Sequence, residues 1–287
     1  MKTILELLRV RQYSKNLFIF LPIFFGLRIM EVSLVEKVFM AFIGFCLVAS
    51  SVYIINDYRD KKEDLMHPVK KFRPIASGRV KPGVAIIVGL FVLILGLVIE
   101  SLVNIPTLLW TLGYFVINLA YSFGLKRFAL VDVFIIALCF VIRVFVGGTS
   151  TAITLQPWIV VMTFLLALFM ALGKRRDDFN LEKVLKVRLR KSITVYNAQY
   201  LDYLMVFMAA VIQVSYLLYT LSPDIETKFK SGDLYYTAFF VLLGIMRYMQ
   251  IVFVERGGGS PTDIFLKDKI IQASLIGWII TFGILIY

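Results

Sequence analysis

Residues 55–80 hold the side chains whose types and spacing are most typical of chemistry. Three acidic residues, Asp57, Asp60 and Asp64, follow one another at steps of three and four, which places them on one face of a predicted helix. Carboxylates gathered in this way repel each other unless a cation lies between them. Hard oxygen ligands suit Mg2+, which takes one or two carboxylates and completes its shell with water and substrate phosphate. We therefore predict a metal site formed by these residues and the side-chain oxygen of Asn56.

A run of basic residues follows the acidic residues and includes Lys70, Lys71 and Arg73. Acidic residues that hold a metal, followed by basic residues that hold phosphate, indicate a binding site for a diphosphate. A solvated charged loop is the alternative interpretation. We favour the binding site because the whole stretch comes directly after a very apolar segment.

The composition of the chain is that of a membrane protein. Its 287 residues are 60% hydrophobic, and the mean hydropathy is +0.84. Apolar runs of about 18 or more residues, the length of a membrane helix, recur along it. Cys46 and Cys139 both lie in apolar runs, so we interpret them as small packed residues and not as a disulfide or metal pair. His67 is the only histidine, which excludes a metal site built from several histidines.

Nine apolar stretches are long enough to be membrane-spanning helices. We therefore predict an all-α membrane protein with nine transmembrane helices, which forms a single domain over residues 1–287. The first stretch is the weakest, because Pro22 interrupts it and Arg28 lies at its far end. The predicted spans are residues 16–31, 38–56, 83–103, 106–124, 130–149, 155–173, 201–221, 235–254 and 270–287.

Charged residues are distributed unequally between the two sides of this predicted bundle. Most Lys and Arg residues lie on the side of the N-terminus, in the connections after the second, fourth, sixth and eighth spans. The positive-inside rule places that side in the cytoplasm and the C-terminus outside. The net charge of +12 is then explained by topology and anionic head groups, so nucleic acid is not an expected partner. We expect residues 1–15 to form a short interfacial helix and not a cleaved signal peptide.

A second charged cluster follows the sixth predicted span, on the same side of the membrane as the first. Asp178 and Glu182 are four residues apart, so they share one face of a helix. We predict that the two clusters face each other and hold Mg2+ on both sides of a diphosphate, whose oxygens the basic residues bind. A basic loop that only fixes topology is the alternative. The members of this cluster are Lys174, Arg175, Arg176, Asp177, Asp178 and Glu182.

Four further polar residues lie in the fourth and fifth predicted spans or in the connection between them. Tyr121, Ser122 and Lys126 lie near the cytoplasmic end of the fourth, where they can bind a phosphate or hydroxyl group; an aromatic belt and a topology-fixing lysine are the alternative. Arg143 lies past the middle of the fifth span, where a charge is costly and usually functional. We expect it to face the bundle interior and to pair with a bound anion or, in the structural alternative, with an acidic residue.

The acidic motifs resemble those of the UbiA superfamily of intramembrane prenyltransferases. The first motif of the superfamily, N-D-x-x-D-x-x-x-D, is matched in full by residues 56–64, and the second, D-x-x-x-D, is matched loosely by residues 178–182. The resemblance implies a nine-helix UbiA-type bundle with cytoplasmic active-site loops and a dependence on Mg2+, with Mn2+ as a substitute. The catalytic residues it implies are Asp57, Asp60 and Asp178, and the implied metal ligands are Asn56, Asp57, Asp60, Asp64, Asp177, Asp178 and Glu182.

A narrower likeness extends over nearly the whole chain and is to the decaprenyl-phosphate phosphoribosyltransferases of this superfamily. It includes residues 11–16, the pattern H-P-x-K-x-x-R-P-I-A-S-G at residues 67–78, the L-G-K-R of residues 172–175, the S-P-T-D of residues 260–263, and Asp268. The substrate-binding residues that this resemblance implies are Lys15, Asn16, Lys70, Arg73, Tyr121, Ser122, Lys126, Arg143, Lys174 and Arg175.

This likeness implies transfer of the 5-phosphoribosyl group from phosphoribosyl diphosphate (PRPP) to a polyprenyl phosphate. Diphosphate is released through an oxocarbenium-like transition state. The implied setting is the inner, or plasma, membrane of a bacterium and cell wall biosynthesis. The implied partners are the lipid bilayer, the polyprenyl phosphate and PRPP, and formation of a homo-oligomer is left open.

Three other classes of function are compatible with a helical membrane protein. A UbiA-type prenyltransferase, which moves a prenyl group from a prenyl diphosphate to an aromatic or lipid acceptor, is the alternative enzyme. A transporter is disfavoured because the acidic residues cluster at one membrane surface, and no matched pair of broken helices is evident. A membrane scaffold does not need carboxylates at this spacing in two places.

Overall fold

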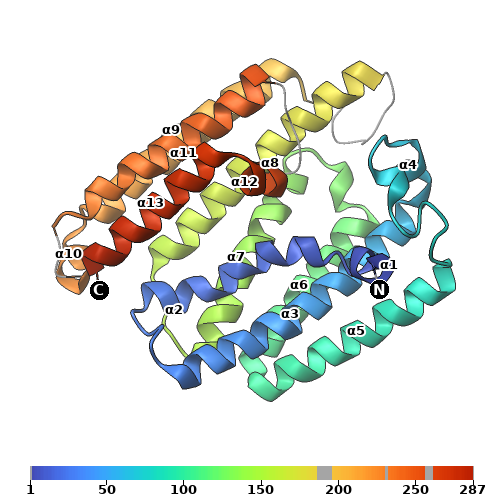
Figure 1. The fold of residues 1–287 in the computed structure, drawn as a ribbon, viewed down its shortest axis with the longest axis horizontal. Coiled ribbons are helices and arrows are strands. Elements are labelled where there is room, and N and C mark those ends of the chain that lie inside the picture. Colours follow the sequence, from blue (N-terminus) through green and yellow to red (C-terminus); the bar gives the residue numbers. More distant parts are fainter. Residues whose placement is uncertain (1, 186–195, 230–231, 256–260, 287) are drawn as a thin grey trace. The chain divides into compact units, whose positions relative to one another are not determined.

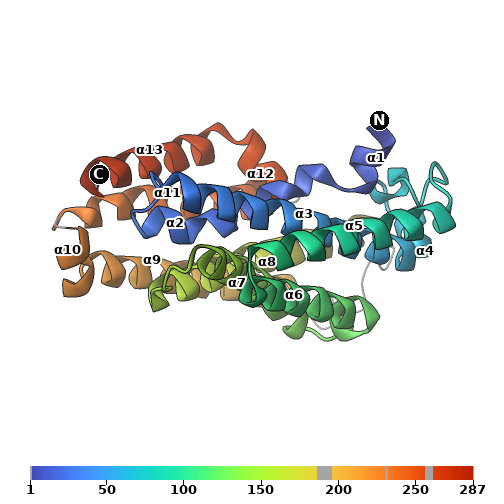
Figure 2. The same cartoon turned by 90° about the horizontal axis from the view of Figure 1, so that it is seen from below.

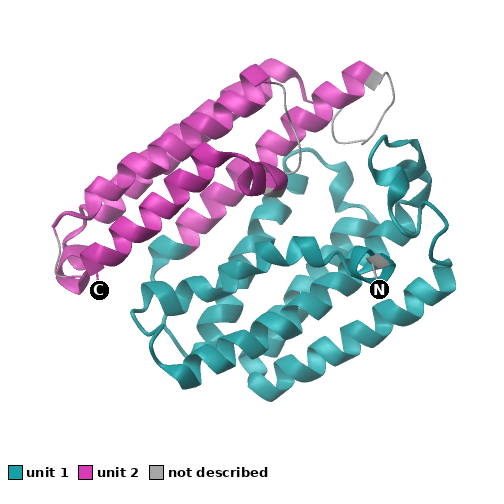
Figure 3. Ribbon diagram, in the orientation of Figure 1, with its two compact units in different colours: residues 1–159 teal, residues 160–287 magenta. Residues whose placement is uncertain are grey.

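The computed structural model describes residues 2–185, 196–229, 232–255 and 261–286, which form helices and connections with no β-strand among them (Figure 1). Helices are expected, because in a bilayer the backbone polar groups must find hydrogen-bond partners within the chain. The chain divides into two compact units, Met1–Ile159 and Val160–Tyr287 (Figure 3). The boundary falls in the first turn of α8 (Pro157–Leu185). The single domain over residues 1–287 stays a prediction.

The first unit is built around α3 (Val32–Arg59), which packs along α5 (Pro82–Val103) and also contacts α6 (Ile105–Phe123) and α7 (Val131–Thr151). Both views show α3 beside α5 (Figure 1, Figure 2). Gly96 of α5 permits this close approach, because a Cβ atom there would lie 2.7 Å from the backbone oxygen of Gly44. The other elements are α1 (Lys2–Leu7), η1 (Val10–Phe20), α2 (Leu21–Phe25), α4 (Lys61–Met66), η2 (Lys70–Phe72) and η3 (Leu125–Arg127).

Local sequence signals set the starts of α5 and α6. Pro82 lies in the first turn of α5, where its missing N–H group is no loss. The side chain of Asn104 accepts a hydrogen bond from the backbone N–H of Thr107 at 2.8 Å and so caps the start of α6. The tight joint between these helices places them side by side and antiparallel, and α6 then delivers Ser122 to the same end of the unit as the end of α3.

The second unit consists of α8 and the helices that follow it. Helix α11 (Ala238–Gln250) packs against α13 (Lys269–Ile286), and Ser274 Oγ of α13 donates to the backbone oxygen of Phe240 at 3.0 Å. Trp278 Nε1 donates to the hydroxyl of Tyr216 at 2.6 Å, which joins α13 to α9 (Ala198–Thr220). The remaining elements are α10 (Pro223–Phe229), η5 (Leu234–Thr237), η6 (Ile251–Glu255) and α12 (Pro261–Lys267).

Eight helices within the described residues are long and apolar enough to cross a membrane. They correspond to the second through ninth predicted spans. The first predicted span, residues 16–31, is built differently: it contains the end of η1 and the five-residue α2, with Pro22 in its first turn. A membrane crossing by residues 16–31, which would bring the total to nine, therefore stays a prediction. The eight helices are Val32–Arg59, Pro82–Val103, Ile105–Phe123, Val131–Thr151, Pro157–Val184, Ala198–Thr220, Leu234–Glu255 and Lys269–Ile286.

A charged contact joins the end of α11 to the start of α13. Arg247 donates from Nη2 and Nε to Oδ2 of Asp268, at 2.7 and 3.1 Å. The other carboxylate oxygen of Asp268 accepts the backbone N–H groups of Ile270 and Ile271, at 3.1 and 3.0 Å, and so caps α13. The hydrogen bonds from Arg247, with help from those backbone groups, hold the pKa of Asp268 below its ordinary value.

We expect Asp268→Asn to lower the free energy of unfolding by at most about 1 kcal/mol, the upper end for an ion pair near solvent, because asparagine keeps an oxygen that can cap α13. Because the pKa of Asp268 is lower in the folded chain, its carboxylate stabilises the fold above the ordinary aspartate pKa of about 3.9. That contribution is lost as the pH falls through the folded-state pKa. Thermal unfolding in detergent at several pH values measures this. If Asp268→Asn is less stable than wild type by the same amount at neutral pH and well below about pH 4, the expectation is contradicted.

Candidate active site

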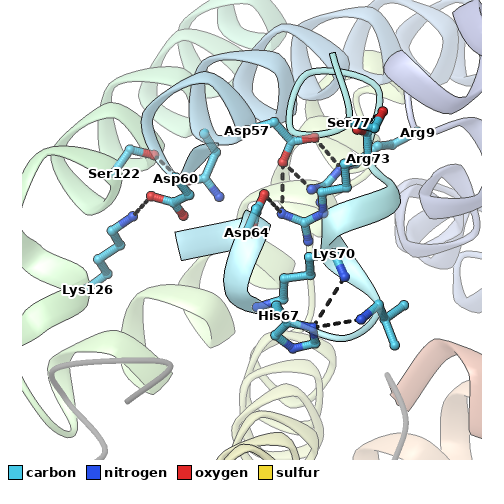
Figure 4. Close-up of polar contacts among 12 residues, drawn as sticks. Arg9, Asp57, Asp60, Asp64, His67, Lys70, Arg73, Ser77, Ser122 and Lys126 are labelled. Carbon is cyan, nitrogen blue, oxygen red and sulfur yellow. Dashed lines mark hydrogen bonds and ion pairs between the residues drawn. The ribbon is translucent and has the colours of Figure 1, made fainter. Parts of the chain in front are cut away.

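The acidic motif lies where α3 ends and α4 begins. Helix α3 stops at Arg59, and α4 starts at Lys61, with Asp60 between them at φ −88° and ψ 11°. The backbone N–H of Asp60 still donates to the oxygen of Asn56 at 2.9 Å, and that of Asp64 donates to the oxygen of Asp60 at 2.8 Å. The break between the two helices at Asp60 separates the acidic side chains. Asp57 and Asp64 point toward Arg73, whereas Asp60 points toward Lys126 (Figure 4). The prediction of one shared helix face for the three acids is therefore wrong.

Asp57 and Asp64 share one cationic nitrogen. Nη1 of Arg73 donates to Oδ1 of Asp57 at 3.0 Å and to Oδ2 of Asp64 at 2.7 Å. Both acids are buried, with exposed fractions of 2% and 3%. Arg9 provides a second cation, since its Nε donates to Oδ2 of Asp57 at 3.1 Å and its Nη2 pairs with Oδ1. Two buried carboxylates are thus matched by two guanidinium groups, as burial of charge requires.

The environment of Asp64 favours a nearby cation. Burial raises the pKa of the Asp64 carboxyl above its ordinary value, and the charge of Asp57 adds to this effect. Arg73 opposes the shift, both by its charge and by its hydrogen bond. A further cation at this position would therefore stabilise the ionised form, which is the form that binds metal.

Asp60 belongs to a second group of contacts, between the end of α3 and the end of α6. Nζ of Lys126, which lies in η3, forms an ion pair with Oδ1 of Asp60. Ser122 Oγ of α6 donates to the side-chain oxygen of Asn56 at 3.3 Å. The structure thus pairs the predicted residues Asn56 with Ser122 and Asp60 with Lys126. Figure 4 shows the Asp60–Lys126 pair. Tyr121, the preceding residue of α6, is half-buried.

His67 organises the loop that carries Lys70 and Arg73. Its Nδ1 accepts the backbone N–H groups of Val69 and Lys70, each at 3.2 Å (Figure 4). Ser77 Oγ donates to the backbone oxygen of Arg73 at 2.7 Å, so it contacts the backbone of this loop. The histidine therefore serves as a turn-forming residue, and it helps to aim Arg73 at the two buried carboxylates.

The carboxylate oxygens of Asp57, Asp60 and Asp64 are ligands that a hard divalent cation prefers. Among the described residues, no three His, Cys, Asp or Glu side chains are grouped as a ready-made metal site. Asp57 and Asp64 nevertheless converge on one positively charged nitrogen, which is a position that a cation already occupies. These two residues would hold a metal ion after exchanging the guanidinium for it, and Asp60 would follow after release of Lys126.

Asn16 and Arg143 lie in another buried polar group, inside the first unit. Arg143 is 2% exposed, and it donates from Nε to the side-chain oxygen of Asn16 at 2.8 Å and from Nη1 to the backbone oxygen of Cys139 at 2.5 Å. Its guanidinium lies 4.9 Å from the ring centroid of Tyr114. The acidic partner considered for Arg143 is absent from these contacts, which join it to neutral groups of the described chain. Lys15, next to Asn16, is half-buried.

The second charged cluster lies at the end of α8, in the second unit. Arg175 is 1% exposed, and its Nη1 pairs with Oδ2 of Asp178 at 2.8 Å. Nε of Arg176 pairs with Oδ1 of Asp202 in α9, also at 2.8 Å. The other predicted members, which are half-buried, are Lys174, Asp177 and Glu182. That this cluster faces the Asp57–Asp64 segment stays a prediction.

Two charged residues in these groups were not predicted as site residues. Arg9 belongs to the interfacial helix that the sequence predicts over residues 1–15, and the sequence predicts no role for Asp202. Arg9 precedes the matched segment 11–16 by only two residues, yet an arginine near a membrane surface is common in any membrane protein. Arg9 reaches Asp57 because the backbone turns at Arg9, and the pattern of charges in the sequence does not reveal such a turn.

The fold and the site define a class of protein: a helical membrane protein with buried carboxylates that are neutralised by arginine and lysine. The sequence matches the UbiA prenyltransferase family over residues 19–266, and the chain belongs to that family. It is similar to the decaprenyl-phosphate phosphoribosyltransferase of Mycolicibacterium smegmatis, with 32% identity over 295 residues that cover 99% of this chain and 92% of the relative. The corresponding enzyme of Corynebacterium glutamicum is 30% identical over 290 residues, covering 99% and 86%.

Solved structures show the same fold. A UbiA homolog from Archaeoglobus fulgidus bound to GPP and Mg2+ has a TM-score of 0.73 at 18% identity, covering 96% of this chain and 97% of that one. A digeranylgeranylglyceryl phosphate synthase has a TM-score of 0.63 at 19% identity, covering 99% and 95%. The predicted UbiA-type, all-α membrane fold is therefore confirmed.

Proposed function

We propose that this protein is a transferase that moves the 5-phosphoribosyl group of PRPP to the phosphate of a polyprenyl phosphate. The observation that carries the proposal is the nearly full-length likeness to relatives named decaprenyl-phosphate phosphoribosyltransferase, at 30–32% identity. In the reaction the bond between C1 of ribose and the diphosphate oxygen breaks, and its electron pair leaves with the diphosphate. A phosphate oxygen of the lipid then bonds to C1.

The charged residues support this chemistry. Mg2+, when bound, would act as a Lewis acid on the leaving diphosphate. Asp57 and Asp64 would hold it, since they already share a cation. Lys126 and Arg73 would bind phosphate oxygens, where negative charge grows as the C1–O bond breaks. The attacking lipid phosphate is already an anion, so no general base is required for it. Solved relatives with bound Mg2+ support the choice of metal.

A prenyltransferase is the second candidate, because one observation favours it specifically. The solved structures of the same fold include a UbiA homolog bound to GPP and another bound to DMAPP, both with Mg2+. At 18% identity this likeness concerns the fold. In this reading the same metal and cations would stabilise the diphosphate that leaves an allylic carbon.

One experiment separates the two candidates. Purified protein in nanodiscs is incubated with Mg2+, PRPP labelled in the ribose, and a polyprenyl phosphate. A labelled lipid is the expected product. In a parallel reaction geranyl diphosphate and an aromatic acid replace the two substrates. Prenylation of the ring, with PRPP left intact in the first reaction, would reject the phosphoribosyl proposal in favour of the prenyltransferase.

Neutralising Lys174 or Arg175 is expected to weaken the use of PRPP. PRPP carries a 5-phosphate that a prenyl diphosphate lacks, so a phosphoribosyl site needs additional cations. A charge-assisted contact is worth about 1.5–3 kcal/mol, or about ten- to a hundredfold in kcat/KM. Lys174→Gln and Arg175→Gln should each show a loss of that size. Lys183→Gln, an exposed lysine on the same helix, is the matched control. Equal kcat/KM values in the three variants would exclude the α8 cluster from donor binding.

We propose that the N-terminus and the Asp57–Asp64 segment lie in the cytoplasm, that the membrane is the bacterial inner membrane, and that Tyr287 lies outside. A single cysteine at position 62 or 184, in a chain without Cys46 and Cys139, should react with an impermeant thiol reagent only in inside-out vesicles. Both positions are exposed in the structure, so folding does not hide them. Reaction in intact cells would reverse the orientation.

A further inference from the structure

Arg9 joins the N-terminal segment to the first carboxylate of the acidic motif, although it lies outside the motif matches. It forms two parallel contacts with Asp57, from Nε to Oδ2 at 3.1 Å and from Nη2 to Oδ1 (Figure 4). Its guanidinium carbon also lies 5.1 Å from the ring centroid of Tyr53. Paired contacts and a neighbouring ring fix the orientation of a guanidinium group. Arg9 therefore covers both oxygens of Asp57.

The backbone at Arg9 has an uncommon conformation. Its φ of 52° and ψ of 45° are left-handed, a region that residues with a side chain seldom adopt and that persists where surrounding contacts hold it. Such contacts are present on both sides: Ser50 Oγ donates to the backbone oxygen of Leu8 at 2.8 Å and is hydrogen-bonded to the hydroxyl of Tyr13 at 2.9 Å. The turn between α1 and η1 is thus held in the conformation that aims Arg9 at Asp57.

The charges of this group balance without a metal ion. Arg9 and Arg73 carry two positive charges, and Asp57 and Asp64 carry two negative charges. A divalent cation that enters the group makes it strongly positive unless a guanidinium leaves or an anion arrives with it. Arg9 engages both oxygens of Asp57, and Arg73 also engages Oδ1, so a divalent cation that binds this carboxylate meets the repulsion of two guanidinium groups, which is relieved when Arg9 moves away.

We propose that Arg9 is a positioning residue that competes with the divalent cation for Asp57 and, once displaced, turns to the phosphate groups of the donor. The identity of the donor rests on the proposed function, whereas the competition requires only that Asp57 bind a divalent cation. Metal and donor then bind with positive coupling, because the donor gives the displaced guanidinium a new partner. The protein alone holds metal weakly, which keeps the site neutral until an anionic donor is present.

Direct metal binding tests the competition without any turnover. Free Mn2+ is measured by electron paramagnetic resonance during titration of protein in nanodiscs, with no donor present. Arg9→Gln should bind Mn2+ about tenfold more tightly than wild type, since a charge-assisted contact no longer competes. Arg9→Lys keeps a charge but loses the paired contacts, so it should fall between the two.

A matched control is Arg79, which forms an ion pair with the same N-terminal segment. Arg79 Nη1 pairs with Oε2 of Glu6 of α1 at 2.6 Å, so Arg79→Gln also removes an ion pair of that segment but none at Asp57. It should bind Mn2+ as wild type does. In an Asp57→Asn background, Arg9→Gln should give no increase, because Arg9 is argued to act through Asp57.

Several outcomes would overturn the proposal. These are Mn2+ affinity in Arg9→Gln that is unchanged or lower, a similar increase in Arg79→Gln, or an increase that persists without Asp57. Absence of Mn2+ binding in wild type and Arg9→Gln alike would also reject it. Thermal unfolding of each variant confirms that it is folded. The labelled-lipid reaction is read separately, so tighter Mn2+ binding without a phosphoribosyl product would reject the proposed function and keep the role of Arg9.

Discussion

Asp57→Asn and Asp60→Asn are each expected to reduce turnover by about a hundredfold or more, because each removes a carboxylate that would hold the metal at the leaving diphosphate. The two variants differ in their effect on the fold. Asp57 is buried between Arg9 and Arg73, whereas Asp60 is half-buried and pairs with Lys126. Asp60→Asn is therefore the cleaner test, with product formation measured against added Mg2+ at saturating PRPP.

Glu63→Gln is the matched control for this experiment. Glu63 is an exposed carboxylate on α4 between Asp60 and Asp64, at an x position of the motif N-D-x-x-D-x-x-x-D, where no particular residue is specified. It should keep full activity. Chelation of divalent ions by excess EDTA should abolish turnover of wild type, and added Mg2+ should restore it. Full activity in EDTA would show that the carboxylates act without a metal, and a loss in Glu63→Gln equal to that in Asp60→Asn would show a general effect of charge.

The sequence predicts the membrane helices well because one strong constraint determines them. A bilayer requires long apolar runs with internally satisfied backbones, so hydropathy alone places α5 at residues 83–103, against Pro82–Val103 in the structure. The first predicted span has a shorter apolar run and contains Pro22, and the structure replaces a long helix with η1 and α2. Hydropathy reports burial in lipid, and it does not report the local hydrogen-bond pattern that divides this segment.

The candidate site was predicted in its residue types but not in its pairings. Spacing indicated one face for three acids, whereas the bend at Asp60 sends that side chain to Lys126 on another helix. The partner of Asp57, Arg9, is 48 residues away in sequence and reaches it through a left-handed turn. Such contacts depend on tertiary packing, and a local pattern of charge and spacing contains no information about them.

Arg73→Gln is expected to lower the free energy of unfolding by about 3 kcal/mol, because removal of one partner leaves buried carboxylates without their shared cation. Asp57 would keep Arg9, so the larger penalty falls on Asp64, whose burial already disfavours its charge. Lys62→Gln, at an exposed position of α4, should have little effect and serves as the control. Urea unfolding in mild detergent, followed by circular dichroism, measures both.

Added Mg2+ should return part of the stability that Arg73→Gln loses, while it changes the stability of Lys62→Gln much less. A ligand that binds only the folded chain stabilises it, and in Arg73→Gln the position between Asp57 and Asp64 no longer contains a guanidinium nitrogen. The variant thus reports on the same carboxylate pair by stability and not by activity. If Arg73→Gln unfolds like wild type, the two buried carboxylates do not depend on their shared cation. If it is destabilised and Mg2+ has no greater effect on it than on Lys62→Gln, the carboxylates need a cation but do not accept a divalent one.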